Sequence, residues 1–304
     1  MIALAVPLIL VALLVLAVVL LVKKKYKSAI VLAICIVILN WWSDCISFGF
    51  KNSFEGDLKV LSVNVNGSGV FDNDKLEFIS SLISEENPDV LLLMENFTPF
   101  GDSLRLRLRG AYPYYTTDML HHVIYSKTPV SNVKYDELPN KGTAFIVQCD
   151  VTINNQIVKV VGCHLSSNNY SKERNYLTPN KVGKLSDVVR YCRNFKGATH
   201  LRELEAESIV NDIGGKKKIV VMGDFNDVCG SGVLNIFHTA KLKDAWSKGG
   251  LGYGATINHP LPFRIDHVLY GEDLELNGIK IIETMQYSDH DVLVACFDIL
   301  GENR

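Results

Sequence analysis

Short apolar segments that each end in polar side chains recur along this chain of 304 residues. Leu91 to Met94 is followed by Glu95, and Ile219 to Met222 is followed by Gly223 and then Asp224. Apolar runs of this length predict buried strands. Open sheets bind ligands at strand ends, because side chains there are held by the scaffold and remain reachable from solvent. The pattern therefore predicts an α/β protein with a functional site along one sheet edge. The polar residues at strand ends are Asn64, Glu95, His164, Asp224, Asn226 and Asp266, and Asp289 and His290, just before another apolar run, complete the set.

Predicted strands outnumber predicted helices in the rest of the pattern. Helices are expected over residues 74–85 and 201–213, and strands over residues 58–65, 90–94, 122–125, 143–153, 156–164, 218–222, 264–270 and 292–299. The dipeptide Asn154-Asn155 predicts a tight hairpin between two of these strands. Hairpins mixed with helical crossovers indicate an α/β sandwich of two sheets with helices outside.

The N-terminal segment predicts a transmembrane helical hairpin before the sandwich. Residues 1–22 carry no charge, residues 23–27 contain four lysines, and a second apolar run extends from residue 29 to about residue 48. Each run approaches the ~20 residues that a helix needs to cross ~30 Å of hydrocarbon. The positive-inside rule places the lysines in the cytoplasm, so everything after the second run is expected to be extracytoplasmic.

Two alternatives to this topology remain open. A cleaved signal peptide is one, although such peptides carry positive charge before the apolar stretch, and here the lysines follow it. The second run also contains Asp44, close to Trp41 and Trp42. If that run does not insert, the catalytic part stays in the cytoplasm. The expected organisation is two transmembrane helices with a cytoplasmic lysine-rich turn over residues 1–48, a polar linker over 49–57 and a catalytic domain over 58–304.

Charge and cysteine content exclude several classes of protein. From Leu58 onward, 26 lysines and arginines face 30 acidic residues, a net charge of −4. This argues against a broad nucleic-acid-binding surface that acts through counterion release. Five cysteines lie beyond the first 48 residues, and none forms a Cys-x-x-Cys pair. A zinc site and a full disulfide framework are therefore not expected, and most of these cysteines are expected to be small core residues.

The residue types at the strand ends fit phosphate-ester hydrolysis. Carboxylate and amide oxygens suit Mg²⁺, which usually keeps several waters and needs only one or two protein carboxylates. An adjacent His-Asp pair can remove a proton from an attacking water. Each residue alone has an ordinary structural explanation, because an aspartate after a strand commonly caps a turn and a single histidine is commonly structural. The ordered set favours a site.

Five motifs in this order resemble the endonuclease/exonuclease/phosphatase superfamily, which includes deoxyribonuclease I, apurinic endonucleases, neutral sphingomyelinases and inositol-polyphosphate 5-phosphatases. The resemblance implies a four-layered α/β sandwich of the deoxyribonuclease I type and a divalent-metal hydrolase. It covers residues 58 to about 300. The motifs are Leu61-Ser62-Val63-Asn64-Val65-Asn66-Gly67, Asp89-Val90-Leu91-Leu92-Leu93-Met94-Glu95, Gly223-Asp224-Phe225-Asn226, Arg264-Ile265-Asp266-His267 and Ser288-Asp289-His290.

The resemblance also implies a metal site. Glu95 resembles the main Mg²⁺ ligand, helped by Asn64 and Asp289, with Mn²⁺ as an alternative ion. In place of the family's common glutamine before this glutamate, the chain carries Met94, which removes a supporting hydrogen bond.

The remaining residues acquire catalytic roles from the same resemblance. His290 looks like the general base for water, oriented by Asp266. Asn226 is expected to hydrogen-bond the scissile phosphate, and Asp224 to position or protonate the reacting oxygens. His164 looks like a second histidine that contacts the phosphate and assists the leaving group. Apurinic endonucleases generally have a tyrosine in this region, so the two-histidine form favours the nuclease, sphingomyelinase and phosphatase branches.

Two features bear on the substrate, a phosphate ester of nucleic acid or of a lipid headgroup. The segment 168–202 has a net charge of +6 with tyrosines interleaved. It is either a helix with a solvated basic face or an anion-binding flap beside the site. The membrane segment 1–48 favours a lipid-headgroup or inositol-phosphate hydrolase, and the basic segment favours a nuclease-like phosphodiesterase. A non-enzymatic binding protein on this fold would have lost Glu95, Asp224 or His290, and all three are present.

Overall fold

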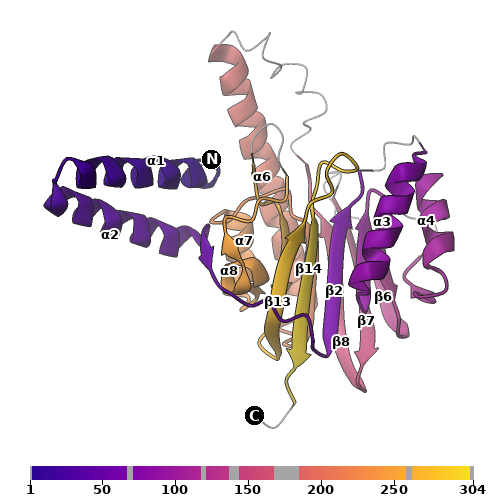
Figure 1. Ribbon diagram of the computed structural model, residues 1–304. Helices are drawn as coiled ribbons and strands as arrows, with labels where there is room; N and C mark the ends of the chain where they lie inside the picture. Colours follow the sequence, from indigo (N-terminus) through magenta and orange to yellow (C-terminus); the bar gives the residue numbers. More distant parts are fainter. Residues whose placement is uncertain are drawn as a thin grey trace.

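The computed structural model describes residues 2–66, 71–117, 121–136, 144–167, 185–257 and 262–301 of the chain (Figure 1). Two six-stranded sheets form the centre of this part. The first sheet has the order β13 (Leu274–Ile282), β14 (Val292–Ile299), β2 (Leu58–Asn64), β3 (Val90–Met94), β5 (Val123–Ser126) and β4 (Tyr114–Tyr115). The second has the order β10 (Lys243–Asp244), β12 (Asp266–Tyr270), β9 (Ile219–Asp224), β8 (Gln156–His164), β7 (Phe145–Ile153) and β6 (Val130–Asp136).

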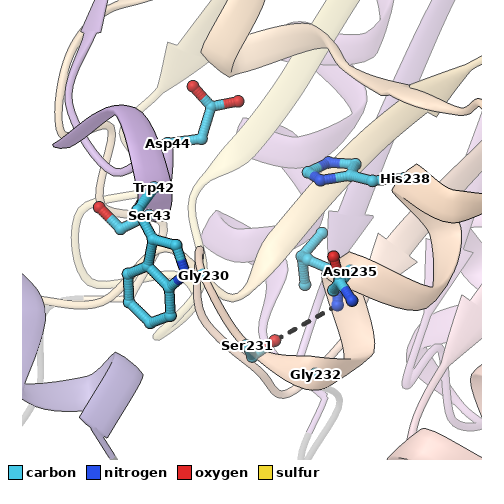
Figure 2. A pocket seen from close by; sticks show the side chains of 9 residues that line it. Trp42, Ser43, Asp44, Gly230, Ser231, Gly232, Asn235 and His238 are labelled. Atoms are coloured by element: carbon cyan, nitrogen blue, oxygen red, sulfur yellow. Dashed lines mark hydrogen bonds between the residues drawn. The ribbon is translucent and has the colours of Figure 1, made fainter. Parts of the chain in front are cut away.

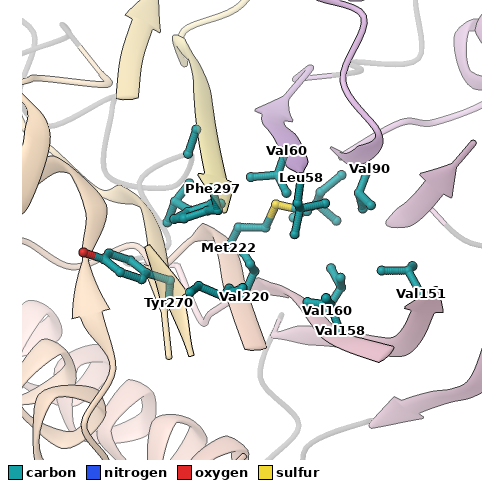
Figure 3. Packing of buried hydrophobic residues seen from close by; sticks show 14 of the residues in the cluster. Leu58, Val60, Val90, Val151, Val158, Val160, Val220, Met222, Tyr270 and Phe297 are labelled. Atoms are coloured by element: carbon teal, nitrogen blue, oxygen red, sulfur yellow. The ribbon is translucent and has the colours of Figure 1, made fainter. Parts of the chain in front are cut away.

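The two sheets pack face to face because the central strands are apolar on both faces. Successive side chains of a strand point to opposite faces. In β2, Val60 therefore joins the core between the sheets, whereas Leu61 faces the outer helices. From the second sheet, Val160 and Met222 meet the first sheet in this inner core (Figure 3). Strands buried on both faces read as continuous apolar runs, which is why the sequence located them well.

Helices cover both outer faces. Helices α3 (Asn73–Glu86) and α4 (Phe100–Leu108) pack on the first sheet, and α6 (Leu185–Ile213) and α7 (Gly232–Thr239) pack on the second. Asp72 caps the start of α3 by accepting hydrogen bonds from the backbone N–H groups of residues 74 and 75. A short helix, α8 (Ala245–Gly249), follows β10. The predicted four-layered α/β sandwich is confirmed.

Two helices precede the sandwich, α1 (Ile2–Val22) and α2 (Tyr26–Ser43), and they lie side by side as a hairpin that projects from one side of it (Figure 1). By length and composition, α2 is suited to crossing a membrane. A further apolar stretch, Val6–Val22, lies in α1. The short strand β1 (Ser47–Phe48) then pairs with β11 (Leu251–Gly252), so the chain leaves α2 directly onto the sandwich.

A disulfide joins the two parts of the molecule. Cys45, just after α2, is bonded to Cys229 in the loop after β9. The expectation that the later cysteines are core residues holds for Cys149, Cys163 and Cys296, which are buried and free. Cys229 is the exception, because it is buried but disulfide-bonded, and the side chain of Cys192 lies outside the described residues. A pairing across 184 residues leaves no local sequence pattern.

Candidate active site

Strand direction gathers the predicted site residues at one edge. Strands β2 and β3 run parallel, and so do β8 and β9, so their carboxyl ends lie at the same end of each sheet. These ends hold Asn64, Glu95, His164 and Asp224. In the second sheet, the register pairs Asp224 with both His164 and Asp266. His290 lies just before β14, which runs antiparallel to β2 and therefore begins at the same edge.

His290 and Asp266 form a buried hydrogen-bonded pair. The distance between His290 Nδ1 and Asp266 Oδ2 is 2.9 Å, and the other ring nitrogen, Nε2, lies 3.7 Å from Asp224 Oδ2. Burial alone would lower the pKa of His290, but the carboxylates of Asp266 and Asp224 outweigh it and raise that pKa to about 10. The backbone N–H of Asp266 donates to Thr256 Oγ1, which fixes the start of β12.

A second polar cluster surrounds Asp224. Asn64 Nδ2 donates to Glu95 Oε1 at 3.1 Å and lies 3.5 Å from Asp224 Oδ2, so this contact bridges the two sheets. His164 Nε2 lies 3.5 Å from Asp224 Oδ2 and 3.7 Å from Glu95 Oε1. Glu95 adopts a left-handed backbone conformation with φ 51°, as do other site-loop residues described below. Such conformations are disfavoured for side-chain-bearing residues and concentrate at functional sites.

The two remaining predicted residues lie on loops at the same edge. Asn226, with φ 50°, donates from Nδ2 to the backbone oxygen of Leu165 at 2.9 Å. Asp289 accepts a hydrogen bond of 2.7 Å from Nδ2 of Asn66, another left-handed residue with φ 42°. Ser288 donates to the backbone oxygen of Asn64, which ties the loop before β14 to the end of β2.

The cluster suits a hard divalent cation. Ligand atoms of Asp224, Asp266 and His290 lie within 4.8 Å of one another. His290 Nδ1 and Asp266 Oδ2 bond to each other, so a cation would meet the remaining carboxylate oxygens of Asp224 and Asp266 and those of the neighbouring Glu95. Carboxylate oxygens are the ligands that Mg²⁺ prefers. Asn64 presents its amide nitrogen to Glu95, while its oxygen accepts from the Asn66 N–H, so it holds the carboxylate in position.

Sequence reasoning missed His122 as a site residue. Its Nε2 lies 2.9 Å from His164 Nδ1, and its ring stacks on Phe145 with a centroid distance of 4.6 Å. Burial, with a smaller contribution from His164, lowers the pKa of His122 to about 3, so this ring is neutral at physiological pH. A signal was present in the sequence. His122 directly precedes β5, which runs antiparallel to β3 and therefore begins at the sheet edge where the predicted site residues lie.

Met94 occupies the position where the family commonly has glutamine. It is fully buried at the end of β3, and its sulfur lies 3.3 Å from the backbone nitrogen of Asp224. A thioether is a weak acceptor that fills irregular space between packed segments. Met94 thus contacts the end of β9 in the opposite sheet through its sulfur.

Arg202 does not belong to an anion-binding surface. It is fully buried, donates from Nε to Asp227 Oδ2 at 3.0 Å, and donates from Nη1 to the backbone oxygen of Ser166 at 3.0 Å. These contacts join α6 to the loops after β8 and β9, which carry His164 and Asp224. Including Arg202 in the predicted basic flap is therefore wrong. The other basic side chains of segment 168–202 lie outside the described residues.

A separate cavity lies at the junction of α2 with the sandwich. It has a volume of about 300 Å³ and is lined by Trp42, Ser43 and Asp44 on one side and by residues of the loop before α7 and of α7, including Ser231, Asn235 and His238, on the other (Figure 2). None of the predicted site residues lines it.

Comparisons with known proteins agree with this architecture. The profile of the Endonuclease/Exonuclease/phosphatase family matches residues 61–290. No curated protein sequence matches the chain significantly. Crystal structures with the same fold include D. rerio TDP2 complexed with a single-strand DNA product, with 17% identity and TM-score 0.59, covering 79% of this chain and 98% of that one. Sphingomyelinase C from Streptomyces griseocarneus has 14% identity and TM-score 0.53, and the match covers 79% of this chain and 99% of that one. The endonuclease/exonuclease/phosphatase from Beutenbergia cavernae has 18% identity and TM-score 0.58, and the match covers 81% of this chain and 72% of that one.

Proposed function

The chain belongs to the endonuclease/exonuclease/phosphatase family, and on this premise we propose that it is a divalent-metal-dependent phosphoesterase, most directly a nuclease-like phosphodiesterase. The observation that carries the proposal is the convergence of two histidines and three carboxylates at one sheet edge, with the His290–Asp266 pair at 2.9 Å. A buried His-carboxylate pair beside further carboxylates suits water activation next to a bound phosphate.

In this proposal each side of the phosphate has its own residues. His290 removes the proton from the attacking water through Nε2, and Asp266 orients the ring through Nδ1. Asn226 donates to a non-bridging phosphate oxygen, and Asp224 positions the reacting oxygens between the two histidines. His164 donates from Nε2 on the leaving-group side.

Glu95, with Asn64 and Asp289 in support, would hold a Mg²⁺ or Mn²⁺ ion, which supplies positive charge to the phosphate. The charge balance of the site favours such an ion. A base must be neutral before it accepts a proton, whereas the nearby carboxylates raise the pKa of His290 to about 10. A cation bound close to these carboxylates would oppose their effect and lower the pKa of His290 toward neutral pH.

His122 fixes the tautomer of the His164 ring through a hydrogen bond. Because Nε2 of His164 faces two carboxylates, it carries a proton, and Nδ1 then accepts the hydrogen bond from Nε2 of the neutral His122. A neutral partner differs from a carboxylate, since it fixes the tautomer without adding negative charge to the site.

Replacing His122 by phenylalanine is expected to lower kcat about threefold to tenfold, which corresponds to the loss of one hydrogen bond, while KM changes little. Phenylalanine retains the ring that stacks on Phe145, so packing is preserved. His122→Gln returns an amide donor at a similar position and is expected to restore most of kcat. Steady-state kinetics of the two variants make the test, and equal kcat in wild type and His122→Phe would exclude the positioning role.

We also propose that residues 1–48 anchor the protein in a membrane and that residues 58–304 act on its extracytoplasmic side, with 49–57 as the connection. Two observations support this placement. One is the length and composition of α2. The other is the Cys45–Cys229 disulfide, because disulfides persist in oxidising compartments and are rare in the cytosol.

A second candidate function is hydrolysis of a phospholipid headgroup or an inositol phosphate. The specific observation that favours it is the attachment of the sandwich directly to α2, which keeps the site close to lipid. The fold is also that of Sphingomyelinase C from Streptomyces griseocarneus, as it is that of D. rerio TDP2 complexed with a DNA product.

A substrate panel separates the two functions. The full-length protein in detergent or lipid is assayed with Mg²⁺ on single-stranded DNA, plasmid DNA, RNA, and vesicles that contain sphingomyelin or phosphoinositide. The primary proposal expects nucleic-acid cleavage whose rate falls steeply with salt, because phosphate contacts release counterions. Hydrolysis of the vesicle lipids alone would contradict the nuclease-like function and support hydrolysis of phospholipid headgroups.

A further inference from the structure

An exposed apolar patch surrounds the point where α2 joins the sandwich. Each of its five large side chains is between 57% and 83% exposed. Isolated exposed apolar residues are ordinary on proteins, whereas a group of them marks an interaction surface. We call this group the junction patch, and it consists of Trp41, Trp42, Phe48, Phe50 and Leu251.

The backbone places three of these side chains together. Phe48 in β1 is the cross-strand partner of Leu251 in β11, so the two side chains stand on the same face of this ribbon. Ser47, one residue earlier, points inward and is buried. Phe50 follows Phe48 by two positions in extended chain, which returns it to the outer side. The two tryptophans occupy the last turn of α2, a few residues before.

This region is fixed to the sandwich rather than hinged. The Cys45–Cys229 disulfide lies between the tryptophans and Phe48 in sequence. Arg264 is buried and lies two residues before Asp266 in the sequence. Its Nη2 donates to the backbone oxygen of Asp44 at 3.4 Å. Ser47 Oγ donates to the backbone oxygen of Ser247 at 3.1 Å. One disulfide and two side-chain hydrogen bonds therefore connect the end of α2 and the chain after it to the sandwich.

We propose that the sandwich rests on the bilayer through the junction patch, with Phe48, Phe50 and Leu251 inserted among the lipid headgroups. The inference rests on the membrane insertion of α2 proposed above. Continuity argues for lipid as the occupant. The apolar surface of α2, on which Ile34, Val37 and Ile38 are all more than half exposed, ends at Trp41 and Trp42, which are themselves members of the patch.

The chemistry of the patch agrees with this occupant. Tryptophan concentrates at membrane–water interfaces, because its ring is apolar and its N–H is polar. Two lysines adjoin the patch in sequence, Lys51 next to Phe50 and Lys248 three residues before Leu251, and their side chains are 44% and 51% exposed. Lys51 Nζ donates to the backbone oxygen of Leu276, and Lys248 Nζ lies 3.8 Å from Asp44 Oδ2. Basic side chains close to a membrane surface are also attracted to headgroup phosphates. Trp42 of the patch also lines the cavity beside α7 (Figure 2).

The arrangement determines how the active site faces the membrane. The helical hairpin projects across the direction of the strands rather than along it (Figure 1). With the hairpin spanning the bilayer, the catalytic edge of the sheets faces along the membrane surface. Substrates then enter from the side, parallel to the bilayer.

Tryptophan fluorescence of the full-length protein in nanodiscs tests the contact. Phe50→Trp adds a reporter in the patch, and Phe48→Trp is a second reporter in case the first does not fold. The matched control is Leu106→Trp, since Leu106 is 69% exposed on α4 at the far side of the sandwich (Figure 1). Lipids brominated near the headgroup are expected to quench the emission added by the patch reporters and to leave the added control emission unchanged.

Two results would overturn the inference. Unquenched emission from the patch reporters, with quenching of the parent tryptophans, would mean that α2 inserts but the sandwich stands clear of the bilayer. Absence of all quenching would mean that the chain is not inserted. The readout involves no hydrolysis, so its failure is distinct from failure of the proposed phosphoesterase activity.

Discussion

Replacing His290 by asparagine is expected to lower kcat for phosphodiester hydrolysis by about 10² to 10⁴, the range that general acid–base catalysis contributes. The asparagine amide lies where His290 Nδ1 lies, so it can still donate to Asp266 Oδ2, now 2.9 Å from that nitrogen. The variant lacks Nε2, which lies 3.7 Å from Asp224 Oδ2 and is the atom that takes the proton from the attacking water in the proposed mechanism. Steady-state kinetics at saturating substrate and Mg²⁺ measure the loss.

The control for this variant is His200→Asn, because the His200 side chain is 72% exposed on α6. It is expected to retain the wild-type kcat. Thermal unfolding of both variants shows whether the sandwich is intact. A folded His290→Asn variant with wild-type kcat would exclude His290 as the base, and the water would then have to be activated elsewhere.

Replacing Glu95 by glutamine is expected to remove most of the metal-dependent activity. Glutamine keeps an oxygen that can accept from Asn64 Nδ2, but it lacks the negative charge that a divalent cation requires. Loss of a residue that only supports a metal ligand typically costs about 10 to 100-fold, so loss of the ligand itself is expected to cost at least that. Titration of activity with Mg²⁺ is expected to show a weakened apparent affinity for the ion.

Glu207→Gln is the matched control, since Glu207 is exposed on α6. It removes the same charge from the chain outside the site and is expected to leave the Mg²⁺ titration unchanged. Identical titration curves for wild type and Glu95→Gln would mean that Glu95 does not hold the ion, and the pair of Asp224 and Asp266 would become the candidate ligands.

The sequence predicted most closely those elements whose burial is reflected in a continuous apolar run. Strands β3, β8 and β14 have the predicted boundaries, because each is buried on both faces or nearly so. The same runs located the site, since polar residues at the ends of parallel strands must meet at one edge. The hairpin at Asn154-Asn155 also forms, with φ of 49° and 63° at the two residues.

Elements that depend on distant contacts were predicted less well. Helix α6 runs without a break from Leu185 to Ile213, so the helix expected over residues 201–213 and the helical alternative for the basic segment 168–202 belong to one element. Gly197 lies within it, and glycine costs a helix interior about 1 kcal/mol relative to alanine, which is why the sequence pattern divides there. Strand β13 contains Asn277-Gly278, a typical turn sequence, and the structure accommodates it as an irregularity in the register with β14.

Two contacts could not be predicted from local patterns at all. His122 becomes a site residue only because β5 brings it to His164, which is 42 residues away in the sequence. The Cys45–Cys229 disulfide depends on how the end of α2 docks behind the catalytic loops. Both follow from tertiary packing, which residue spacing alone does not specify.

The central claim is that the cluster at the sheet edge hydrolyses phosphodiesters with a divalent metal ion. The most direct measurement is the hydrolysis of bis-p-nitrophenyl phosphate by the full-length protein in detergent, with Mg²⁺ or Mn²⁺, then with a chelator, and then with the ion restored. Hydrolysis that stops with the chelator and returns with the ion is the predicted result. A rate that the chelator leaves unchanged, or no hydrolysis above the uncatalysed rate with either ion, would contradict the claim.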